Sequence, residues 1–240
     1  MRKIKFITLL VLLPFLMGFI SDDKNGGNKT GTKQMPSNTV AFVKKIVLDV
    51  TYRKTSEQSD WELAKTGTLL EDGGEVKTGD KSLALVLFTD GSGLLRVREN
   101  SILHIYGTKK EKAMNKNTFI QKGLINFEVN KQSTDEEFKF TTPTVVASIR
   151  GTDGFLNYSE DSTFTMYLNS GSAGLTGSAG CDSLTAGSTI VITGDGQCNT
   201  GQASQSNINT FNSTKNTNEK KIKIKTNKGE VEIKYYGPSN

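Results

Sequence analysis

Few residues in the 240-residue sequence have the type and spacing that catalysis requires. His104 is the single histidine, and it alternates with apolar neighbours as a residue in a β-strand would. A serine or cysteine nucleophile needs an activating base that a third group orients, and no second histidine can fill either role. Glu136 and Glu137 lie beside Lys131 and Lys139 in an expected turn, which is typical of a solvated charged surface. We therefore expect no catalytic residue and no enzyme activity.

The two cysteines, Cys181 and Cys198, could form a disulfide or bind a metal. A structural metal site needs about four ligands, and the only histidine lies far away in the sequence, so we expect no metal site. A glycine-rich phosphate-binding motif is also missing, and we expect no cofactor. In an oxidising compartment an even pair of cysteines predicts a disulfide, and the alternative is two free thiols in a compartment without disulfide-forming enzymes.

The first 21 residues have the order of a secretory signal peptide. Arg2, Lys3 and Lys5 precede an apolar stretch over residues 6–20, after which the chain becomes polar. The alternative is an uncleaved membrane anchor, which Pro14 weakens as a lasting helix. We expect cleavage, and a periplasmic or cell-surface location.

Cleavage of this signal also changes the charge of the protein. Its three basic residues account for part of the formal net charge of +5, and the remainder is +2. Nucleic-acid binding needs a concentrated basic surface, so we expect no nucleic-acid partner. Residues 22–38 have almost no apolar side chains and predict a flexible linker.

Short apolar runs separated by turn residues dominate residues 39–198. The alternation over residues 40–50 predicts a long edge strand or a pair of strands. Residues 82–88 are apolar on both faces, so we expect a central strand covered on both sides. We expect one helical turn near residues 56–63 and a charged loop over residues 109–117. Further strand-like runs cover residues 94–98, 102–106, 125–129, 138–140, 145–149, 155–158, 164–168 and 189–192. The fold class is therefore mainly β, as a roll, a sandwich or a β-solenoid-like domain.

The last 42 residues are predicted to form a linker and a hairpin. Residues 199–218 are rich in Asn, Thr, Ser and Gln and predict a loose polar linker, and residues 219–240 predict a β-hairpin that turns at Asn227–Gly229. An isolated hairpin is marginally stable in water, so it should dock on the main domain or pair with a partner. We expect its lysines to form cross-strand ion pairs and to protect an edge, rather than to bind anionic lipid or glycan. These lysines are Lys220, Lys221, Lys223, Lys225 and Lys228, and they face Glu230 and Glu232.

Two short motifs could serve either structure or binding. Asp90-Gly91-Ser92 predicts a tight hairpin turn rather than a cation-binding loop. Arg150, which follows an alternating apolar run, is expected to pair with an internal carboxylate and hold a turn. On that interpretation Arg150→Ala should lower the melting temperature. The alternative places Arg150 in a ligand groove.

The series of motifs from Trp61 to Ile192 resembles the FecR domain family. The resemblance rests on the order of Thr78-Gly79, Asp90-Gly91-Ser92, Thr142-Pro143 and Arg150-Gly151-Thr152 ahead of an aromatic residue. Two departures are Gly154, inserted before Phe155, and Gly93-Leu94, where the family continues directly into a strand. We expect the motif residues to have structural roles.

The resemblance implies a β-rich module outside the cytoplasmic membrane. The best-known members of the family are anti-sigma regulators that receive a signal from an outer-membrane transporter through the membrane. Only about twenty residues precede the end of the apolar stretch, so we expect no sigma-factor-binding arm in this chain.

The predicted function is a non-catalytic, protein-binding or scaffold module of the bacterial envelope. Its partner would be an envelope protein or a second copy of the chain, and membrane contact would occur only through an uncleaved signal segment or a lipid-binding tail. The alternative is a protein that binds glycan or cell wall. Its aromatic platforms would be Tyr106, Tyr158, Tyr235 and Tyr236.

Overall fold

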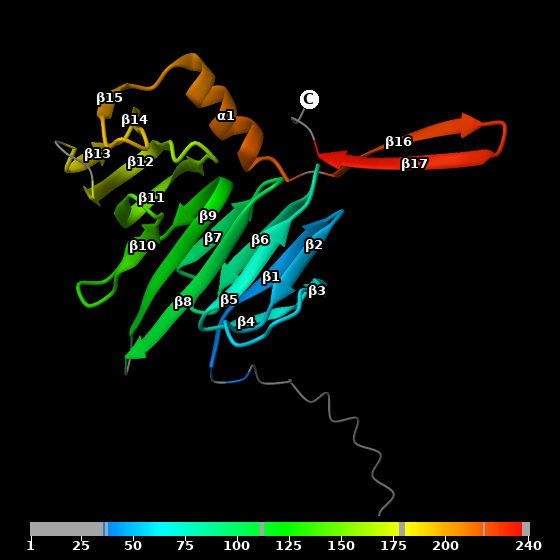
Figure 1. Ribbon diagram of the computed structural model, residues 1–240, viewed down its shortest axis with the longest axis horizontal. Coiled ribbons are helices and arrows are strands. Elements are labelled where there is room, and N and C mark those ends of the chain that lie inside the picture. The colour runs from blue at the N-terminus through cyan, green and yellow to red at the C-terminus, as the bar shows by residue number, and fades with distance from the viewer. Residues whose placement is uncertain (1–35, 37, 111–112, 178–180, 218, 237–240) are drawn as a thin grey trace, which may run out of the picture. The chain divides into compact units, whose positions relative to one another are not determined.

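The computed structural model describes residues 36, 38–110, 113–177, 181–217 and 219–236 (Figure 1). The expected signal peptide and nearly all of the expected linker at 22–38 lie outside these residues. In the part of the chain that is described, no helix has the length and apolar character needed to cross a membrane.

The described chain is mainly β, which confirms the predicted fold class. The strands are β1 (Thr39–Val47), β2 (Val50–Arg53), β3 (Glu62–Leu63), β4 (Leu69–Glu71), β5 (Gly74–Thr78), β6 (Leu83–Phe88), β7 (Gly93–Val97), β8 (Ile102–Lys110), β9 (Ala113–Val129), β10 (Phe138–Thr141), β11 (Val146–Tyr158), β12 (Phe164–Thr176), β13 (Ser183–Thr185), β14 (Ser188–Ile192), β15 (Cys198–Gln202), β16 (Glu219–Thr226) and β17 (Gly229–Tyr236). Within the described ranges there is one helix, α1 (Gln205–Lys215). Strands β1 to β15 form one open sheet, and β16 and β17 form a separate hairpin.

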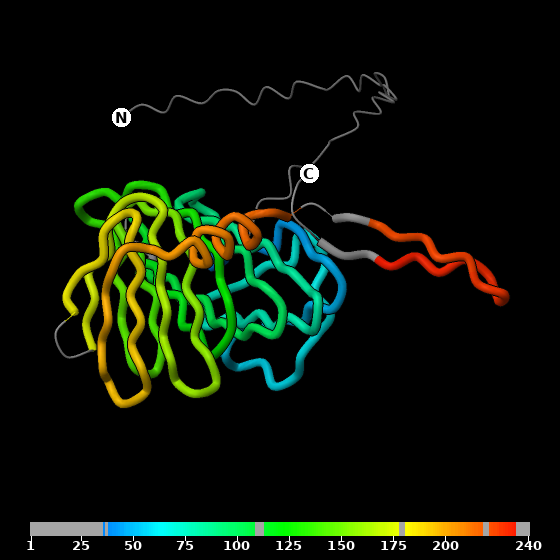
Figure 2. Tube along the Cα trace, turned by 90° about the horizontal axis from the view of Figure 1, so that it is seen from above, coloured from blue at the N-terminus to red at the C-terminus, as the bar shows by residue number. Residues whose placement is uncertain are grey.

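The open sheet is rolled into two layers because β9, β11 and β12 each belong to both. The first half of β9 pairs with β8 and β10, and its second half pairs with β7 and β11. Layer one runs in the order β4-β1-β6-β7-β9-β11-β12-β14-β15. Layer two runs in the order β3-β2-β5-β8-β9-β10-β11-β12-β13. The chain therefore coils between the layers, and Figure 2 shows successive coils side by side.

The hydrophobic core lies between the two layers. Phe88 of layer one contacts Phe138 of layer two with ring centroids 5.0 Å apart, and Phe127 contacts Phe140 across the same interior at 4.8 Å. All four rings are buried, and burial of each such side chain stabilises the fold by roughly 1.5–3 kcal/mol. This core is what holds the layers against each other.

The predicted central strand at residues 82–88 corresponds to β6, which lies between β1 and β7. Val86 faces the main core, whereas Leu83 and Leu85 pack in a second cluster with Val47, so β6 is covered on both faces as predicted. Residues 40–50 form two strands rather than one long edge strand, and these two strands do not pair with each other. The strand β1 lies between β4 and β6, and β2 starts at Val50 after a break.

Glycines at the bends bring successive coils into close contact. Gly151, Gly171 and Gly187 have φ angles of +62°, +80° and +77°. A Cβ atom on Gly171 would lie 2.3 Å from the Gly151 carbonyl oxygen, and the Ala186 N–H donates to the Gly171 carbonyl at 3.1 Å. The bends therefore stack on one another as a column, which we call the corner column. Lys131 lies in the same column, because its Cα would be 3.0 Å from a Cβ on Gly151.

Three local predictions were wrong. Residues 56–63 form turns and β3 rather than a helical turn. The described part of residues 109–117 continues β8 and β9, because Thr108 pairs with Asn115 in the ladder between them, while residues 111–112 lie outside the description. Residues 199–218 contain β15 and α1 in place of a loose linker.

The helix α1 was missed because its sequence is almost entirely polar. It begins after Ser204, whose hydroxyl accepts a hydrogen bond from the Asn207 N–H at 3.3 Å. In return, the Asn207 side chain accepts from the Ser204 N–H at 3.0 Å. This reciprocal capping satisfies two backbone donors at the helix start, and it uses Asn where the usual motif has Glu or Gln.

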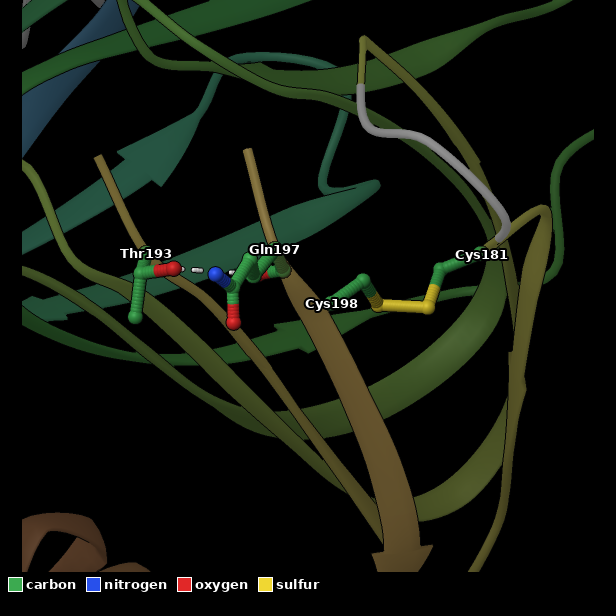
Figure 3. The surroundings of a disulfide bond; sticks show 4 residues. All are labelled: Cys181, Thr193, Gln197 and Cys198. Atoms are coloured by element: carbon green, nitrogen blue, oxygen red, sulfur yellow. Dashed lines mark hydrogen bonds between the residues drawn. A yellow bond between two sulfur atoms is a disulfide. The ribbon is translucent and has the colours of Figure 1, made fainter. Parts of the chain in front are cut away.

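The predicted disulfide between Cys181 and Cys198 is present (Figure 3). Cys181 precedes β13 in layer two, and Cys198 begins β15 at the open edge of layer one. The bond therefore links the two layers where the sheet ends. The adjacent hairpin between β14 and β15 is held by the Thr193 N–H, which donates to the Gln197 carbonyl at 3.0 Å.

Replacing both cysteines by alanine is expected to lower the free energy of unfolding. The bond closes a loop with a sequence separation of 17 residues, and the chain-entropy model gives a loss of about 3 kcal/mol. Urea unfolding of the oxidised protein and of the double variant measures this difference. Dithiothreitol should destabilise the natural protein by the same amount and should leave the double variant unchanged. Equal stability of the two proteins without reductant would contradict the prediction.

Candidate functional site

Thr78 and Gly79, the first family-motif residues, hold a bend at the end of β5. The Thr78 hydroxyl donates to the Arg98 carbonyl at 2.5 Å and accepts from the Ser101 N–H at 3.0 Å. The Gly79 N–H donates to the Asp49 carbonyl at 2.9 Å, and a Cβ on Gly79 would lie 2.9 Å from the Asp49 carboxylate. These contacts give both residues a structural role.

Asp90-Gly91-Ser92 forms the predicted turn between β6 and β7. The Asp90 carboxylate accepts from the Ser92 N–H at 3.0 Å and from the Ser92 hydroxyl at 2.7 Å, and Gly91 has φ +72°. The other carboxylate oxygen lies 2.6 Å from the Nζ of Lys116, whose side chain is completely buried. Asp90 is therefore the counterion of a buried lysine.

The charged partner of Asp90 could not be found by reading the motif. Partial burial favours the neutral acid, but hydrogen bonds from Lys116 and Ser92 outweigh it and hold the pKa of Asp90 below its usual value. Lys116 lies within the segment that the sequence predicted to be a charged loop. The sequence could have indicated a buried Lys116 through its position two residues from both Met114 and Thr118. Alternate residues of a strand share a face, and both of these neighbours are buried in β9.

Thr142 and Pro143 form the turn between β10 and β11. The Thr142 hydroxyl accepts from the Val145 N–H at 3.0 Å, and the Thr142 N–H donates to the Val145 carbonyl at 2.8 Å. Thr152, from the last motif, is also buried. These residues shape the coil.

Arg150 differs from the prediction. Its side chain is exposed, and within the described residues it forms no ion pair with a carboxylate. The expected internal pairing is therefore wrong, because alternation along β11 directs Arg150 outward while Ile149 faces the core. Arg150 instead lines a pocket of about 330 Å³ at the corner column, together with Lys131 and Gln132.

Arg150→Ala is accordingly expected to leave stability nearly unchanged. Exposed substitutions away from caps and buried networks usually alter the free energy of unfolding by less than about 0.5 kcal/mol. Thermal melting followed by circular dichroism measures this. A large fall in melting temperature would restore the structural role that the sequence suggested.

The helix α1 covers the outer face of layer one. Phe211 of the helix packs against Phe155 and Tyr167, with the Tyr167 and Phe211 ring centroids 5.6 Å apart. Beneath it, the fully buried Asn126 side chain donates to the Thr214 hydroxyl at 3.2 Å. The strands β9, β11 and β12 therefore carry a docked helix on this face.

Charged side chains fix the end of this helix. Arg98 donates to the carbonyls of Thr214 and Asn216 at 3.3 and 3.1 Å, which places a cation at the helix C-terminus. Lys215 lies 3.1 Å from the Glu128 carboxylate, which also accepts from Arg96 at 3.1 Å. Alternation over residues 94–98 places Arg96 and Arg98 on the face opposite the core, and the docked helix covers this face and buries both side chains.

His104 belongs to a row of side chains on the outer face of layer two. Its Nδ1 lies 3.5 Å from the Glu75 carboxylate, which also lies 3.4 Å from Arg53. The His104 ring packs against Tyr106 and Phe119. Over the described ranges, no group of three or more His, Cys, Asp or Glu residues is placed to hold a metal ion.

The proposed aromatic platforms are not equivalent. Tyr158 is only 5% exposed, so it cannot offer a ring to a glycan, and that prediction was wrong. Tyr106 is half-buried, and burial, with Glu75 and Asp72 nearby, raises its pKa. The side chains of Tyr235 and Tyr236 lie outside the description.

The hairpin of β16 and β17 has one apolar face and one charged face. The apolar face carries two cross-strand pairs, Ile222 with Ile233 and Ile224 with Val231. These four side chains are 44–49% exposed. Each of the two strands pairs only with the other in the described structure. The ribbon therefore presents an aliphatic surface and two unpaired strand edges.

The opposite face of the hairpin has the predicted cross-strand ion pairs. Lys221 lies 3.2 Å from the Glu232 carboxylate, and Lys223 lies 2.9 Å from the Glu230 carboxylate. The sequence of residues 219–236 contains six lysines and three glutamates, so the hairpin keeps a positive net charge.

Comparison with known proteins identifies the central part of the chain. Residues 74–173 match the family model described as FecR protein. No curated protein matches the sequence. Two crystal structures, at 2.50 and 1.65 Å resolution, of a Parabacteroides distasonis protein provisionally described as an anti-sigma factor are similar, each with 12% identity and a TM-score of 0.49. Each match covers 57% of this chain and 63% of that one, which is less than two thirds of its length.

Proposed function

From the FecR domain that this chain carries at residues 74–173, we propose that the protein is a non-catalytic binding module of the bacterial envelope. It holds a partner protein through the hairpin of β16 and β17. The coiled sheet serves as the rigid carrier of that hairpin. The exposed aliphatic face of the hairpin is the observation that carries this proposal.

A free hairpin of this kind gains stability when it is paired. Two-stranded ribbons are marginal in water, and burial of Ile222, Ile224, Val231 and Ile233 would add favourable apolar contacts. Both ribbon edges also present unpaired backbone donors and acceptors. Addition of a partner strand to an edge satisfies these groups, and alternate side chains of that strand pack beside the aliphatic side chains on the same face.

The charge of the hairpin defines the partner further. Six lysines against three glutamates favour a partner strand with acidic side chains among its apolar ones. Lysines along an edge also limit uncontrolled pairing with neutral strands, which is a common device in edge strands. The proposed partner is thus a protein segment that is extended, amphipathic and acidic.

Site-specific photocrosslinking tests the proposal. A benzophenone amino acid replaces Ile224 on the apolar face, and a matched variant carries it at Leu48, an exposed apolar residue of the coiled domain. In the native bacterium, irradiation of the Ile224 variant should give a discrete adduct with one protein, whose sequence contains an acidic amphipathic segment at the crosslinked site. The Leu48 variant should not give this adduct.

A second variant separates binding from folding. Ile222→Ser with Ile233→Ser removes one cross-strand apolar pair, and it should abolish the adduct while the melting temperature of the coiled domain stays constant. Adducts only with a second copy of the chain, only with lipid, or with no molecule at all would refute the proposed partner.

We also propose that the module works outside the cytoplasmic membrane. The order of basic, apolar and polar residues over residues 1–21 supports export, and the disulfide between Cys181 and Cys198 suits an oxidising compartment. Amino-terminal sequencing of the protein from its native envelope should find a start near residue 22. An intact Met1 end would exclude cleavage.

A second candidate function is glycan binding at Tyr106. Its ring lies parallel to that of His104, with the centroids 6.4 Å apart, on the outer face of layer two. If this surface binds cell wall, the protein should sediment with purified peptidoglycan, and Tyr106→Ala should release it. The variant Tyr52→Ala is the control, since Tyr52 is a half-buried tyrosine on β2, which β5 separates from β8.

A further inference from the structure

We propose that the corner column carries a binding site for the C-terminal carboxylate of a peptide. The site, called the corner pocket, is lined by Lys131, Gln132, Thr134, Arg150 and Gly151 and has a volume of about 330 Å³. Ligand pockets in proteins span roughly 300–1,000 Å³, so this volume suits one or two terminal residues of a chain. The site is separate from the hairpin and does not depend on the function proposed for it.

Two cations of the corner pocket have no acidic partner in the described parts of the chain. Arg150 and Lys131 are both exposed, and neither forms an ion pair there. Of the nearby acids, Glu136 accepts from the Ser133 N–H at 3.2 Å, Glu137 lies 2.8 Å from Lys139, and the exposed Asp135 pairs with neither Lys131 nor Arg150. Among the described residues, therefore, neither cation of the pocket has a paired carboxylate.

The fold brings these cations together from separate strands. Lys131 follows β9, and Arg150 lies in the middle of β11. Gly151 has φ +62°, and a Cβ there would be 3.0 Å from the Lys131 Cα, so the two backbone segments touch. Only the stacking of coils at the corner column makes Lys131 and Arg150 neighbours.

Gln132 adds a hydrogen-bond acceptor to this charge. It is 7% exposed, and its Nε2 donates to the Asn130 carbonyl at 2.7 Å. Its Oε1 is buried and has no partner among the described residues. A buried acceptor without a partner is unfavourable, so a ligand donor that reaches Gln132 Oε1 would remove this penalty.

A peptide terminus combines the two groups that the pocket requires. Its carboxylate suits the planar fork of Arg150 and the point charge of Lys131. Its last amide N–H belongs to the same residue as the carboxylate and is the donor offered to Gln132 Oε1. Inorganic phosphate would satisfy the cations alone. The terminus could belong to a protein or to a cell-wall peptide, and these two sources differ in the chirality of the last residue.

Calorimetric titration at low salt tests the site on the full-length protein. The probes are acetyl-L-Ala-L-Ala, its C-terminal amide, acetyl-D-Ala-D-Ala and sodium phosphate. We expect a free acid to bind, and the amide to bind at least about tenfold more weakly. Arg150→Gln should weaken binding of the acid by at least about tenfold, whereas Lys44→Gln, at an exposed lysine on β1, should have no effect. The preferred chirality identifies the source, and either preference supports the proposal.

Gln132→Met separates a peptide site from a general anion site. This variant should weaken binding of the peptide acid and leave binding of phosphate unchanged. An unchanged melting temperature is the check on folding. The proposal is overturned if no acid binds, if the amide binds as well as the acid, if Lys44→Gln acts like Arg150→Gln, or if phosphate and peptide bind equally and Gln132→Met affects neither.

Discussion

Asp90→Ala is expected to lower the free energy of unfolding by about 4 kcal/mol, because it leaves the buried ammonium of Lys116 without its counterion. The two groups are 2.6 Å apart, and the Lys116 side chain has no exposed surface. A buried charge that loses its partner must remain desolvated or lose its proton, and either result is costly. Urea unfolding monitored by circular dichroism measures the loss.

Lys116→Met is the matched control for this prediction. It removes the buried charge itself and keeps the volume, while Asp90 is 28% exposed and retains its hydrogen bonds from Ser92. We therefore expect a loss of less than about 1.5 kcal/mol. If both variants lose the same stability, the cost does not arise from an unpaired lysine.

The same pair makes stability dependent on pH in the acid range. The folded-state pKa of Asp90 lies below its unfolded value of about 3.9, so its contribution is fully present above pH 4 and is lost as pH falls through the folded-state pKa. Unfolding measured from pH 6 down to pH 3 should therefore show a steeper loss for the natural protein than for Lys116→Met. Parallel curves would contradict this assignment.

Gly171→Ala is expected to cost at least about 4 kcal/mol or to prevent folding. The residue has φ +80°, which alanine rarely adopts. Its Cβ would also lie 2.3 Å from the Gly151 carbonyl oxygen and 3.0 Å from the Thr152 Cα. These neighbours are backbone atoms of the adjacent coil, so relief would require the whole corner column to move.

Gly174→Ala, three residues further along β12, is the control. A Cβ atom on Gly174 would meet no other atom within 4 Å, and the φ angle of this residue is not positive. Alanine there should be neutral or should stabilise the protein by up to about 1 kcal/mol through a less flexible unfolded chain. Soluble yield and thermal melting of both variants provide the comparison. Similar behaviour of the two would mean that the corner column is not tightly stacked.

Most strands could be predicted because their signal is local. The double-sided apolar run at residues 82–88 and the alternation over 94–98 specify strands through side-chain periodicity alone. The turn at Asp90-Gly91-Ser92 and the cysteine pair are equally readable from residue type. The polar helix α1 could not be predicted in this way, because its stability comes from capping and from Phe211 docking on layer one rather than from an amphipathic pattern.

The candidate sites were less predictable because they join distant parts of the chain. Arg98 caps a helix 116 residues away, and Asp90 neutralises a lysine 26 residues away. The sequence could identify Arg150 as part of a motif, but it could not show whether the side chain points into the core or toward solvent. One face of β11 is core and the other is solvent, and which residues share a face depends on the bulge between Arg150 and Asp153.

The sequence by itself therefore determined that this chain is β-rich, that Cys181 and Cys198 could pair, and that its last residues form a hairpin. Each of these follows from residue type and spacing within one short segment. Only the tertiary structure decided that Gly151, Gly171 and Gly187 stack in one column, and that Lys131 and Arg150 meet in one pocket. The physical reason is that coiling brings residues from different turns into contact, and no local pattern encodes which turns become neighbours.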